Sequence, residues 1–240
     1  MGNNETGILM GKLDALHRHL AEMKQAAVAF SGGVDSSLLL KVAVDVLGDD
    51  AVGVVAVSAS LPRKERDDAS ELARFMGARL VFLETQELDD PAYAANAPNR
   101  CFHCKDHVYA ALLNYARGQG IPHILDGMNA EDTLDLRPGR AAAKKHGVSS
   151  PLHELGFSKA EVREAARHLG LPNWDKPAAA CLSSRIPYGT AVTSSLLARI
   201  EPRRCLSGPL VSANSASVIM ATLPVWKCLI KLRPGFGTSG

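Results

Sequence analysis

The sequence predicts an α/β protein built on a doubly wound parallel sheet, and three observations support this expectation. Strand-like and helix-like patterns alternate along residues 26–125, as in sheets whose parallel strands are joined by helices. The run Ala51–Val57 is continuously apolar, which is typical of a strand covered on both faces. A small glycine-serine loop follows the first apolar run directly. Because ligands of such sheets bind beyond the carboxyl ends of the strands, we expect the loops after residues 30, 57, 83 and 125 to surround one crevice.

The elements follow from the spacing of apolar residues and from start and stop signals. An amphipathic helix comes first and carries apolar side chains at helical spacing, namely Leu13, Leu16, Leu20 and Met23. Strands are predicted at residues 26–30, 51–57, 80–83 and 123–125, and helices at 34–47, 63–75, 101–117 and 158–169. Gly48 and Gly77 end two of these helices, and Ser158 with Glu161 forms a capping box at the start of another. Residues 84–100 are polar and predict a long mobile loop, and residues 174–189 show no regular period.

Composition narrows the class of protein. The chain has 240 residues, 46% of them hydrophobic, with no apolar stretch of membrane-spanning length and no signal-peptide pattern, so no membrane partner is expected. Its five cysteines are odd in number and scattered, which indicates a reducing compartment and a cytoplasmic protein. Residues 202–240 hold five of the 27 basic residues and none of the 25 acidic ones, so residues 1–201 hold 22 basic and 25 acidic residues. This balance disfavours a nucleic-acid partner.

The loop Ser31-Gly32-Gly33-Val34-Asp35-Ser36 lies between a buried strand and a helix. Glycine has no Cβ, so the backbone amides here can approach a phosphate, and the helix directs the positive end of its dipole toward the same point. A carboxylate beside a polyphosphate needs a cation between them, so Asp35 is interpreted as a Mg²⁺ ligand. The loop is neither a Walker A sequence nor G-x-G-x-x-G. The alternative is a Gly-Ser turn before an ordinary helix.

Cys181 is the candidate nucleophile. Three alanines precede it, and Leu182, two serines and Arg185 follow, which leaves the thiol sterically open. Arg185 and Lys176 would favour the thiolate if they lay close to it, and the Ser-Ser-Arg run suits an anionic ligand group. The alternative is a small buried hydrophobic residue.

The loop resembles the SGGxDS pyrophosphate loop (PP-loop) of the ATP pyrophosphatase superfamily, with its adenine nucleotide alpha hydrolase-like fold. Further motifs make the chain similar to the LarE family of ATP-dependent sacrificial sulfur transferases over roughly residues 10–201. These motifs are Asp126-Gly127-x-Asn129-x-x-Asp132, Arg137-Pro138-Gly139, Ser150-Pro151-Leu152, Ser158-Lys159-Ala160-Glu161 and Asp175–Gly189.

The resemblance implies a PP-loop ATP pyrophosphatase domain at residues 1–175 and a substrate and sulfur-transfer segment at 176–240. Residues 202–240 of this segment do not follow the family pattern and suggest a truncated or frame-altered end. The implied reaction uses ATP and Mg²⁺ to adenylylate a carboxylate of a pyridinium biscarboxylate mononucleotide. Cys181 then displaces AMP, forms a thioester and gives up its sulfur, a step in nickel-pincer nucleotide cofactor synthesis. Family members form homo-oligomers, so a homo-oligomer is expected.

The resemblance also assigns roles to single residues. ATP and pyrophosphate are expected to bind at Ser31, Gly32, Gly33, Asp35, Ser36, Ser58 and Asp126. The substrate is expected to bind at Asn129, Asp132, Ser184, Arg185 and Glu201. Mg²⁺ is expected at Asp35 and Asp126. The alternative for Asp126 and Asp132 is turn and cap chemistry.

Several alternatives remain open at this level. Cys101-x-x-Cys104 suits a redox pair, half of a metal site, or two ordinary helix residues. Cys181 has no near cysteine neighbour in the sequence, which favours the sacrificial form of the family over the form that holds an iron-sulfur cluster. The competing functions are an amide-forming ligase of the NAD or GMP synthetase type, a tRNA thiolase, and an ATP-binding remnant without sulfur transfer.

Overall fold

The computed structural model describes residues 2–133 and 138–201 of the chain. The chain divides into two units, Met1–Pro202 and Arg203–Gly240, of which the first contains all the described elements. The acid-free tail lies outside the described residues, and so does Arg137 of the Arg-Pro-Gly motif. The expected division at residue 175 falls inside the first unit and stays a prediction.

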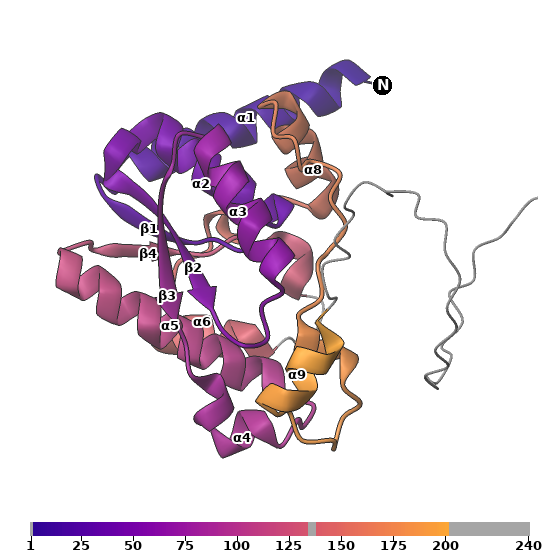
Figure 1. The fold of residues 1–240 in the computed structure, drawn as a ribbon. Coiled ribbons are helices and arrows are strands. Elements are labelled where there is room, and N and C mark those ends of the chain that lie inside the picture. Colours follow the sequence, from indigo (N-terminus) through magenta and orange to yellow (C-terminus); the bar gives the residue numbers. More distant parts are fainter. Residues whose placement is uncertain (1, 134–137, 202–240) are drawn as a thin grey trace, which may run out of the picture. The chain divides into compact units, whose positions relative to one another are not determined.

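A four-stranded parallel sheet forms the centre of this unit (Figure 1). Its strands are β1 (Ala26–Ala29), β2 (Ala51–Val57), β3 (Arg79–Glu84) and β4 (His123–Leu125), in the order β3-β2-β1-β4. In register, Ala26 of β1 lies opposite Ala51 of β2 on one side and His123 of β4 on the other. The chain therefore builds outward from β1 to β3 and then returns to the other side of β1. This confirms the doubly wound parallel sheet and places its switch point between β1 and β4.

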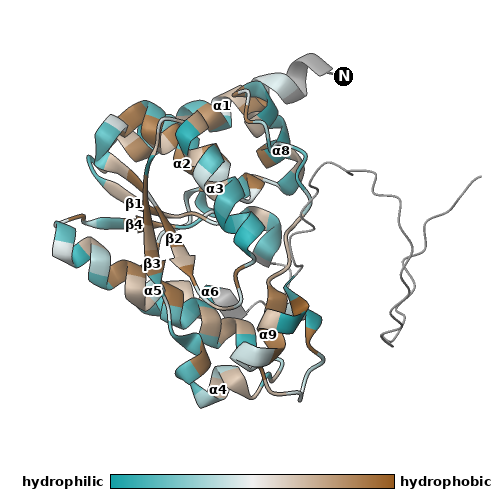
Figure 2. Cartoon of the chain, in the orientation of Figure 1, coloured by the Kyte–Doolittle hydropathy of each residue, from teal (hydrophilic) through white to brown (hydrophobic). Residues whose placement is uncertain are grey.

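Helices cover both faces of the sheet. On one face lie α1 (Gly2–Ala21), α2 (Val34–Leu47), α3 (Arg63–Phe75) and α8 (Lys159–His168); on the other lie α5 (Arg100–Gln119) and α6 (Pro138–His146). Because successive strand residues point to opposite faces, Val28 belongs to the first core and Ala27 to the second. Figure 2 shows hydrophobic colour along the strands and hydrophilic colour on much of α3 and α8.

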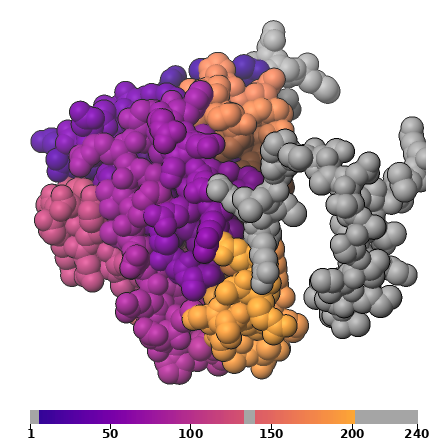
Figure 3. Space-filling view, in the orientation of Figure 1, coloured from indigo at the N-terminus to yellow at the C-terminus, as the bar shows by residue number. Residues whose placement is uncertain are grey.

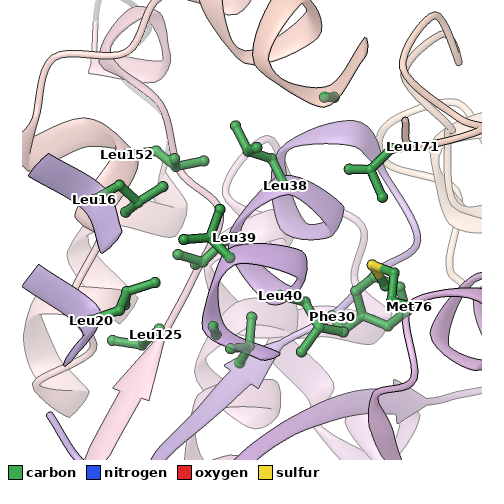
Figure 4. Close-up of a cluster of buried hydrophobic side chains, with 14 of the residues drawn as sticks. Leu16, Leu20, Phe30, Leu38, Leu39, Leu40, Met76, Leu125, Leu152 and Leu171 are labelled. Carbon is green, nitrogen blue, oxygen red and sulfur yellow. The ribbon is translucent and has the colours of Figure 1, made fainter. Parts of the chain in front are cut away.

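The first core is the larger of the two and holds α2 in place. Leu38, Leu39 and Leu40 of α2 are fully buried, and Figure 4 shows them among the labelled side chains Leu16 and Leu20 of α1, Phe30 just after β1, Leu152 and Leu171. Each such side chain contributes roughly 1.5–3 kcal/mol by leaving water. Gly48 ends α2 with a φ of 58°, as the sequence predicted. The glycine-serine loop is therefore mounted on a strand and a helix that are both rigidly packed.

The segment 84–100 corrects the expectation of a long mobile loop. It contains the short 3-10 helix η2 (Glu87–Asp89) and the helix α4 (Pro91–Ala94), and Tyr93, Asn96 and Arg100 are each at most 3% exposed. The polar composition that suggested a loop reflects polar groups that are buried and hydrogen-bonded. The Asn96 amide nitrogen donates to the carbonyls of Ile186, at 3.3 Å, and of Pro187 and Thr190, each at 2.9 Å.

Residues 182–200 pack on this segment. A third hydrophobic cluster joins Tyr93 to residues of the 3-10 helix η4 (Leu182–Arg185), the helix α9 (Ser194–Ile200) and the chain between them; these residues are Leu182, Ile186, Val192 and Leu197. In Figure 3 the surface of residues 190–200, in orange to yellow, borders the surface of the α4 region. The loop that follows Cys181 is thus fixed by buried contacts.

We expect Asn96→Ala to lower the free energy of unfolding by roughly 2–4 kcal/mol, because it removes the amide donor from three carbonyls and one of the acceptors of the buried Arg100 guanidinium. Urea unfolding measures this change. The matched control is the exposed Asn99, whose replacement by alanine should change stability by less than about 0.5 kcal/mol. Equal effects of the two substitutions would contradict a stabilising role for the buried Asn96 hydrogen bonds.

No helix in the described ranges is both long enough and apolar enough to cross a membrane.

Candidate active site

The glycine-serine loop lies at the switch point of the sheet, between the end of β1 and the start of α2. Its shape is set by its own serines. The Ser36 hydroxyl donates to the Gly33 carbonyl at 3.1 Å and accepts from the Ser31 amide at 3.3 Å. Gly32 has a φ of 71°, in the left-handed region, and a Cβ there would lie 3.4 Å from Ala69. The loop therefore requires glycine at this position, and it places backbone amides at the N-terminus of α2.

The end of β4 touches this loop through Gly127. A Cβ at position 127 would lie 2.6 Å from the Ser36 amide nitrogen, well inside van der Waals contact. The two chain segments on either side of the switch point are thus in backbone contact. Within the Asp126-Gly127 motif, the fold therefore leaves no room for a side chain at Gly127.

Asp35 faces α8. Its carboxylate accepts a hydrogen bond from the Asn129 side-chain amide at 2.9 Å and forms an ion pair with Lys159. Lys159 is the first residue of α8, where Ser158 and Glu161 complete the capping box that the sequence predicted. The structure therefore brings Asp35 and Asn129 together, and it adds Lys159, a residue of the Ser158–Glu161 motif for which no role was expected. A lysine in the first turn of a helix opposes the helix dipole, and this unfavourable placement was a signal in the sequence.

Asp126 is 5% exposed, and both of its carboxylate oxygens are occupied. Tyr109 donates to one oxygen at 2.6 Å, and Ser150 and the Met128 amide donate to the other at 2.7 and 3.2 Å. Burial and then the Asp126 charge raise the pKa of Tyr109 far above its usual value, so the phenol keeps its proton and donates. Asp126 thus ties the end of β4 to α5 and to the start of α7 (Pro151–Glu154).

Asp132 and Asn129 also take part in turn structure. One carboxylate oxygen of Asp132 accepts from the Asn129 amide nitrogen at 3.2 Å, and the Asn129 side-chain oxygen accepts from the amides of Glu131 and Asp132. These contacts are turn chemistry, the alternative role for Asp132.

Cys181 is exposed, and its neighbour Leu182 is anchored beside the end of β2. The Leu182 amide donates to the Ser60 carbonyl at 2.9 Å, and the hydroxyls of Ser58 and Ser60 lie 2.8 Å apart. Ser184 donates its hydroxyl hydrogen to the Cys181 carbonyl at 2.6 Å. The open thiol is therefore held next to the loop that follows β2, on the carboxyl side of the sheet.

Lys176, expected near Cys181, and Glu201, expected at the substrate, have other contacts. The Lys176 ammonium lies 2.8 Å from Glu65 and 3.5 Å from Asp68, so it is neutralised by α3. Glu201, expected at the substrate, accepts a hydrogen bond from the Arg63 amide at 3.0 Å and lies 3.5 Å from the Arg63 guanidinium. Both residues hold the 176–201 segment against α3.

The fold also places a second cysteine near Cys181. Burial raises the pKa of the Cys104 thiol to about 12, with further increases from the Glu87 charge and the nearby Cys181 and Cys101 thiols. Cys104 packs against the third hydrophobic cluster. No cysteine is near Cys181 in the sequence. In the fold, however, α5 brings Cys104 close to the Cys181 segment. No group of three potential metal-ligating side chains forms within the part of the chain that the structure describes.

A cavity of about 320 Å³ opens beside this segment. It is lined by Arg100, Ser184, Arg185, Ile186, Pro187 and Tyr188, which include two guanidinium groups and no carboxylate. The expected substrate residues Ser184 and Arg185 thus lie together at one concave, positively charged surface.

The fold and the glycine-serine loop at its switch point define a PP-loop α/β protein of the ATP pyrophosphatase class. No protein-family model matches the chain. The chain is 46% identical over 193 residues to the uncharacterized protein slr1717 of Synechocystis sp., which covers 80% of this chain and 72% of that protein. It is 40% identical over 182 residues to the pyridinium-3,5-bisthiocarboxylic acid mononucleotide synthase of Lactiplantibacillus plantarum, which covers 75% of this chain and 66% of that protein.

Among solved structures, the NMN synthetase of Francisella tularensis has a TM-score of 0.57 and 18% identity, and the match covers 80% of this chain and 91% of that one. This likeness supports the fold. From the two sequence relatives, the chain belongs to the LarE-like family.

Proposed function

We propose that the protein is an ATP-dependent sacrificial sulfur transferase that acts on a pyridinium biscarboxylate mononucleotide. The observation that carries this proposal is the placement of Cys181. An exposed thiol stands on a fixed loop at the carboxyl edge of a PP-loop sheet, next to a cavity lined by two arginines. An amide-forming ligase has no need of such a thiol.

The first proposed step is adenylylation. A carboxylate oxygen of the substrate attacks the α-phosphorus of ATP, and pyrophosphate leaves. Amides of the Ser31–Gly33 loop and the N-terminus of α2 bind the departing phosphates, with Lys159 beside them as a cation. The acyl adenylate then carries AMP as a good leaving group.

The second proposed step transfers sulfur. The Cys181 thiolate attacks the acyl carbon, AMP leaves with the C–O bond electrons, and a thioester links protein and substrate. A base removes the Cys181 Hα, and the C–H electrons form the Cα=Cβ bond as the Cβ–S bond breaks. The sulfur leaves as a thiocarboxylate on the substrate, and dehydroalanine remains in the protein.

Asp35 fits a Mg²⁺ ion that accompanies ATP, and Asp126 does not. Mg²⁺ commonly takes one or two protein carboxylates together with phosphate oxygens, and Asp35 is a partly exposed carboxylate at the start of α2. Asp126 is only 5% exposed and accepts hydrogen bonds from Tyr109, Ser150 and Met128, whereas the Asp35 side chain is 21% exposed. We therefore propose Asp35 alone as the protein ligand. The ion supplies neutralisation of phosphate charge, while Lys159 and Asn129 orient the Asp35 carboxylate.

The wider setting is also a proposal. We propose a cytoplasmic enzyme that acts on a small molecule, since Cys101, Cys104 and Cys181 are free thiols. The homo-oligomer and the absence of a nucleic-acid partner stay predictions.

Lys159→Met tests the adenylylation site. We expect it to slow substrate-dependent pyrophosphate release by about 10²-fold, because a cation beside the leaving phosphates is lost. The control is Lys144→Met, which replaces an exposed lysine of α6. Rates are measured with ATP, Mg²⁺ and the mononucleotide in a coupled pyrophosphate assay. Release that is unchanged in the Lys159 variant, or absent in the wild-type protein, would count against the proposal.

A further inference from the structure

Arg100 is a charged side chain that the proposed mechanism has not used. It is 3% exposed, and one guanidinium nitrogen donates to the Asn96 side-chain oxygen and, at 2.8 Å, to the Ser183 carbonyl. Within residues 2–133 and 138–201, no carboxylate forms an ion pair with it. Its hydrogen-bond partners are therefore neutral.

A buried cation without an opposite charge is costly, because neutral hydrogen bonds replace only part of its hydration. Buried arginines are ordinarily paired with carboxylates or phosphates. The missing negative charge is explained if a ligand supplies it.

The position of Arg100 supports a ligand rather than a structural reason. Arg100 lines the cavity of about 320 Å³ together with Arg185 and Tyr188, and its guanidinium carbon lies 5.8 Å from the centre of the Tyr188 ring. It is also the first residue of the 20-residue helix α5, whose positive dipole end adds to the local potential. The cavity thus combines two guanidinium groups with a helix N-terminus.

Ser184, the hydroxyl expected to bind an anion here, has another role. Its hydrogen is donated to the Cys181 carbonyl at 2.6 Å, which shapes the turn after Cys181. The charged donors that remain available to an anion in this cavity are the guanidinium groups of Arg100 and Arg185.

We propose that Arg100, together with Arg185, binds the phosphate monoester of the mononucleotide substrate. Two guanidinium groups match the double negative charge of a phosphate monoester and offer several charge-assisted hydrogen bonds. Ser184 lines this cavity and is hydrogen-bonded to the Cys181 carbonyl. A phosphate bound in the cavity therefore holds the substrate beside the Cys181 thiol. This assignment rests on the proposed function, because it names a binding residue for that same substrate.

The test compares two ligands and three proteins by calorimetric titration. The ligands are the pyridinium biscarboxylate mononucleotide and its riboside, which lacks only the phosphate. The proteins are the wild type, Arg100→Gln and the control Arg117→Gln, which replaces an exposed arginine near the other end of α5. Inorganic phosphate serves as a third probe that carries the anion alone.

The wild-type protein should bind the mononucleotide more tightly than the riboside. In Arg100→Gln the affinity for the mononucleotide should fall by about 10- to 100-fold, and that for the riboside by less than about threefold. Inorganic phosphate should compete with the mononucleotide in the wild type and not in the variant. Arg117→Gln should leave all three affinities unchanged.

Equal losses for both ligands in Arg100→Gln would show a purely structural role and overturn the inference, as would equal wild-type affinities for the two ligands. Arg100→Lys covers the case in which the glutamine variant unfolds, since it keeps the charge and should retain part of the preference for the phosphate. The proposed function fails separately. If the protein prefers the mononucleotide through Arg100 but releases no pyrophosphate, the inference about Arg100 stands and the proposed function fails. If pyrophosphate release is unaffected by Arg100→Gln, the proposed function stands.

Discussion

Cys181→Ala is expected to release pyrophosphate from ATP in the presence of the mononucleotide and to transfer no sulfur. Adenylylation uses the Ser31–Gly33 loop, and the thiol enters only when AMP is displaced. The variant should retain one turnover of pyrophosphate release at a rate within about threefold of the wild type, and thiocarboxylate formation should fall below detection. Because the side chain is exposed, the substitution should leave thermal stability nearly unchanged.

The control for this experiment is Cys101→Ala. Cys101 is also exposed and lies near the same cluster of cysteines, so it tests whether any thiol in the region suffices. We expect Cys101→Ala to transfer sulfur as the wild type does. Sulfur transfer by Cys181→Ala, or its loss in both variants, would contradict the assignment of Cys181 as the donor.

Gly127→Ala should cause the largest loss of pyrophosphate release among single-methyl changes. A Cβ at this position would lie 2.6 Å from the Ser36 amide nitrogen and 2.8 Å from its Cα, both of them backbone atoms at the start of α2. The clash displaces either the loop or the end of β4. We expect a loss of about 1–3 kcal/mol in the free energy of unfolding and a fall of roughly 10²-fold in the pyrophosphate rate.

The matched control is Gly118→Ala in α5. No atom lies within 4 Å of a Cβ built there, and the residue is helical, so alanine should raise stability by roughly 0.5–1 kcal/mol and leave the rate unchanged. Chemical unfolding and the pyrophosphate assay measure the two quantities. If Gly127→Ala behaved like Gly118→Ala, the backbone contact at the switch point would have no part in ATP binding.

Local patterns predicted the central fold well. The bounds of β2, α2 and α3 agree with the expected residues, because apolar runs and glycine stops specify them within a few residues of sequence. The parallel order followed from the alternation of strands and helices. The segment 84–100 was predicted wrongly, since its polar side chains satisfy carbonyls of Ile186, Pro187 and Thr190 that lie about ninety residues away. Propensity carries no information about such distant partners.

The same limit applies to the site. The glycine-serine loop and the Cys181 motif were recognisable as contiguous sequences. The contact of Lys159 with Asp35, the proximity of Cys104 to Cys181 and the burial of Arg100 depend on the packing of separate elements. Asp126 was identified as important, but its hydrogen bonds with Tyr109 and Ser150 come from α5 and the start of α7 and are consistent with a structural role.

The most direct test of the central claim is the intact mass of the protein after reaction with ATP, Mg²⁺ and the pyridinium biscarboxylate mononucleotide. Sacrificial transfer predicts a loss of one H₂S, about 34 Da, which peptide mapping places at Cys181 as dehydroalanine. An unchanged mass, with thiocarboxylate product formed, would contradict the account, because the sulfur would then come from a source other than this side chain.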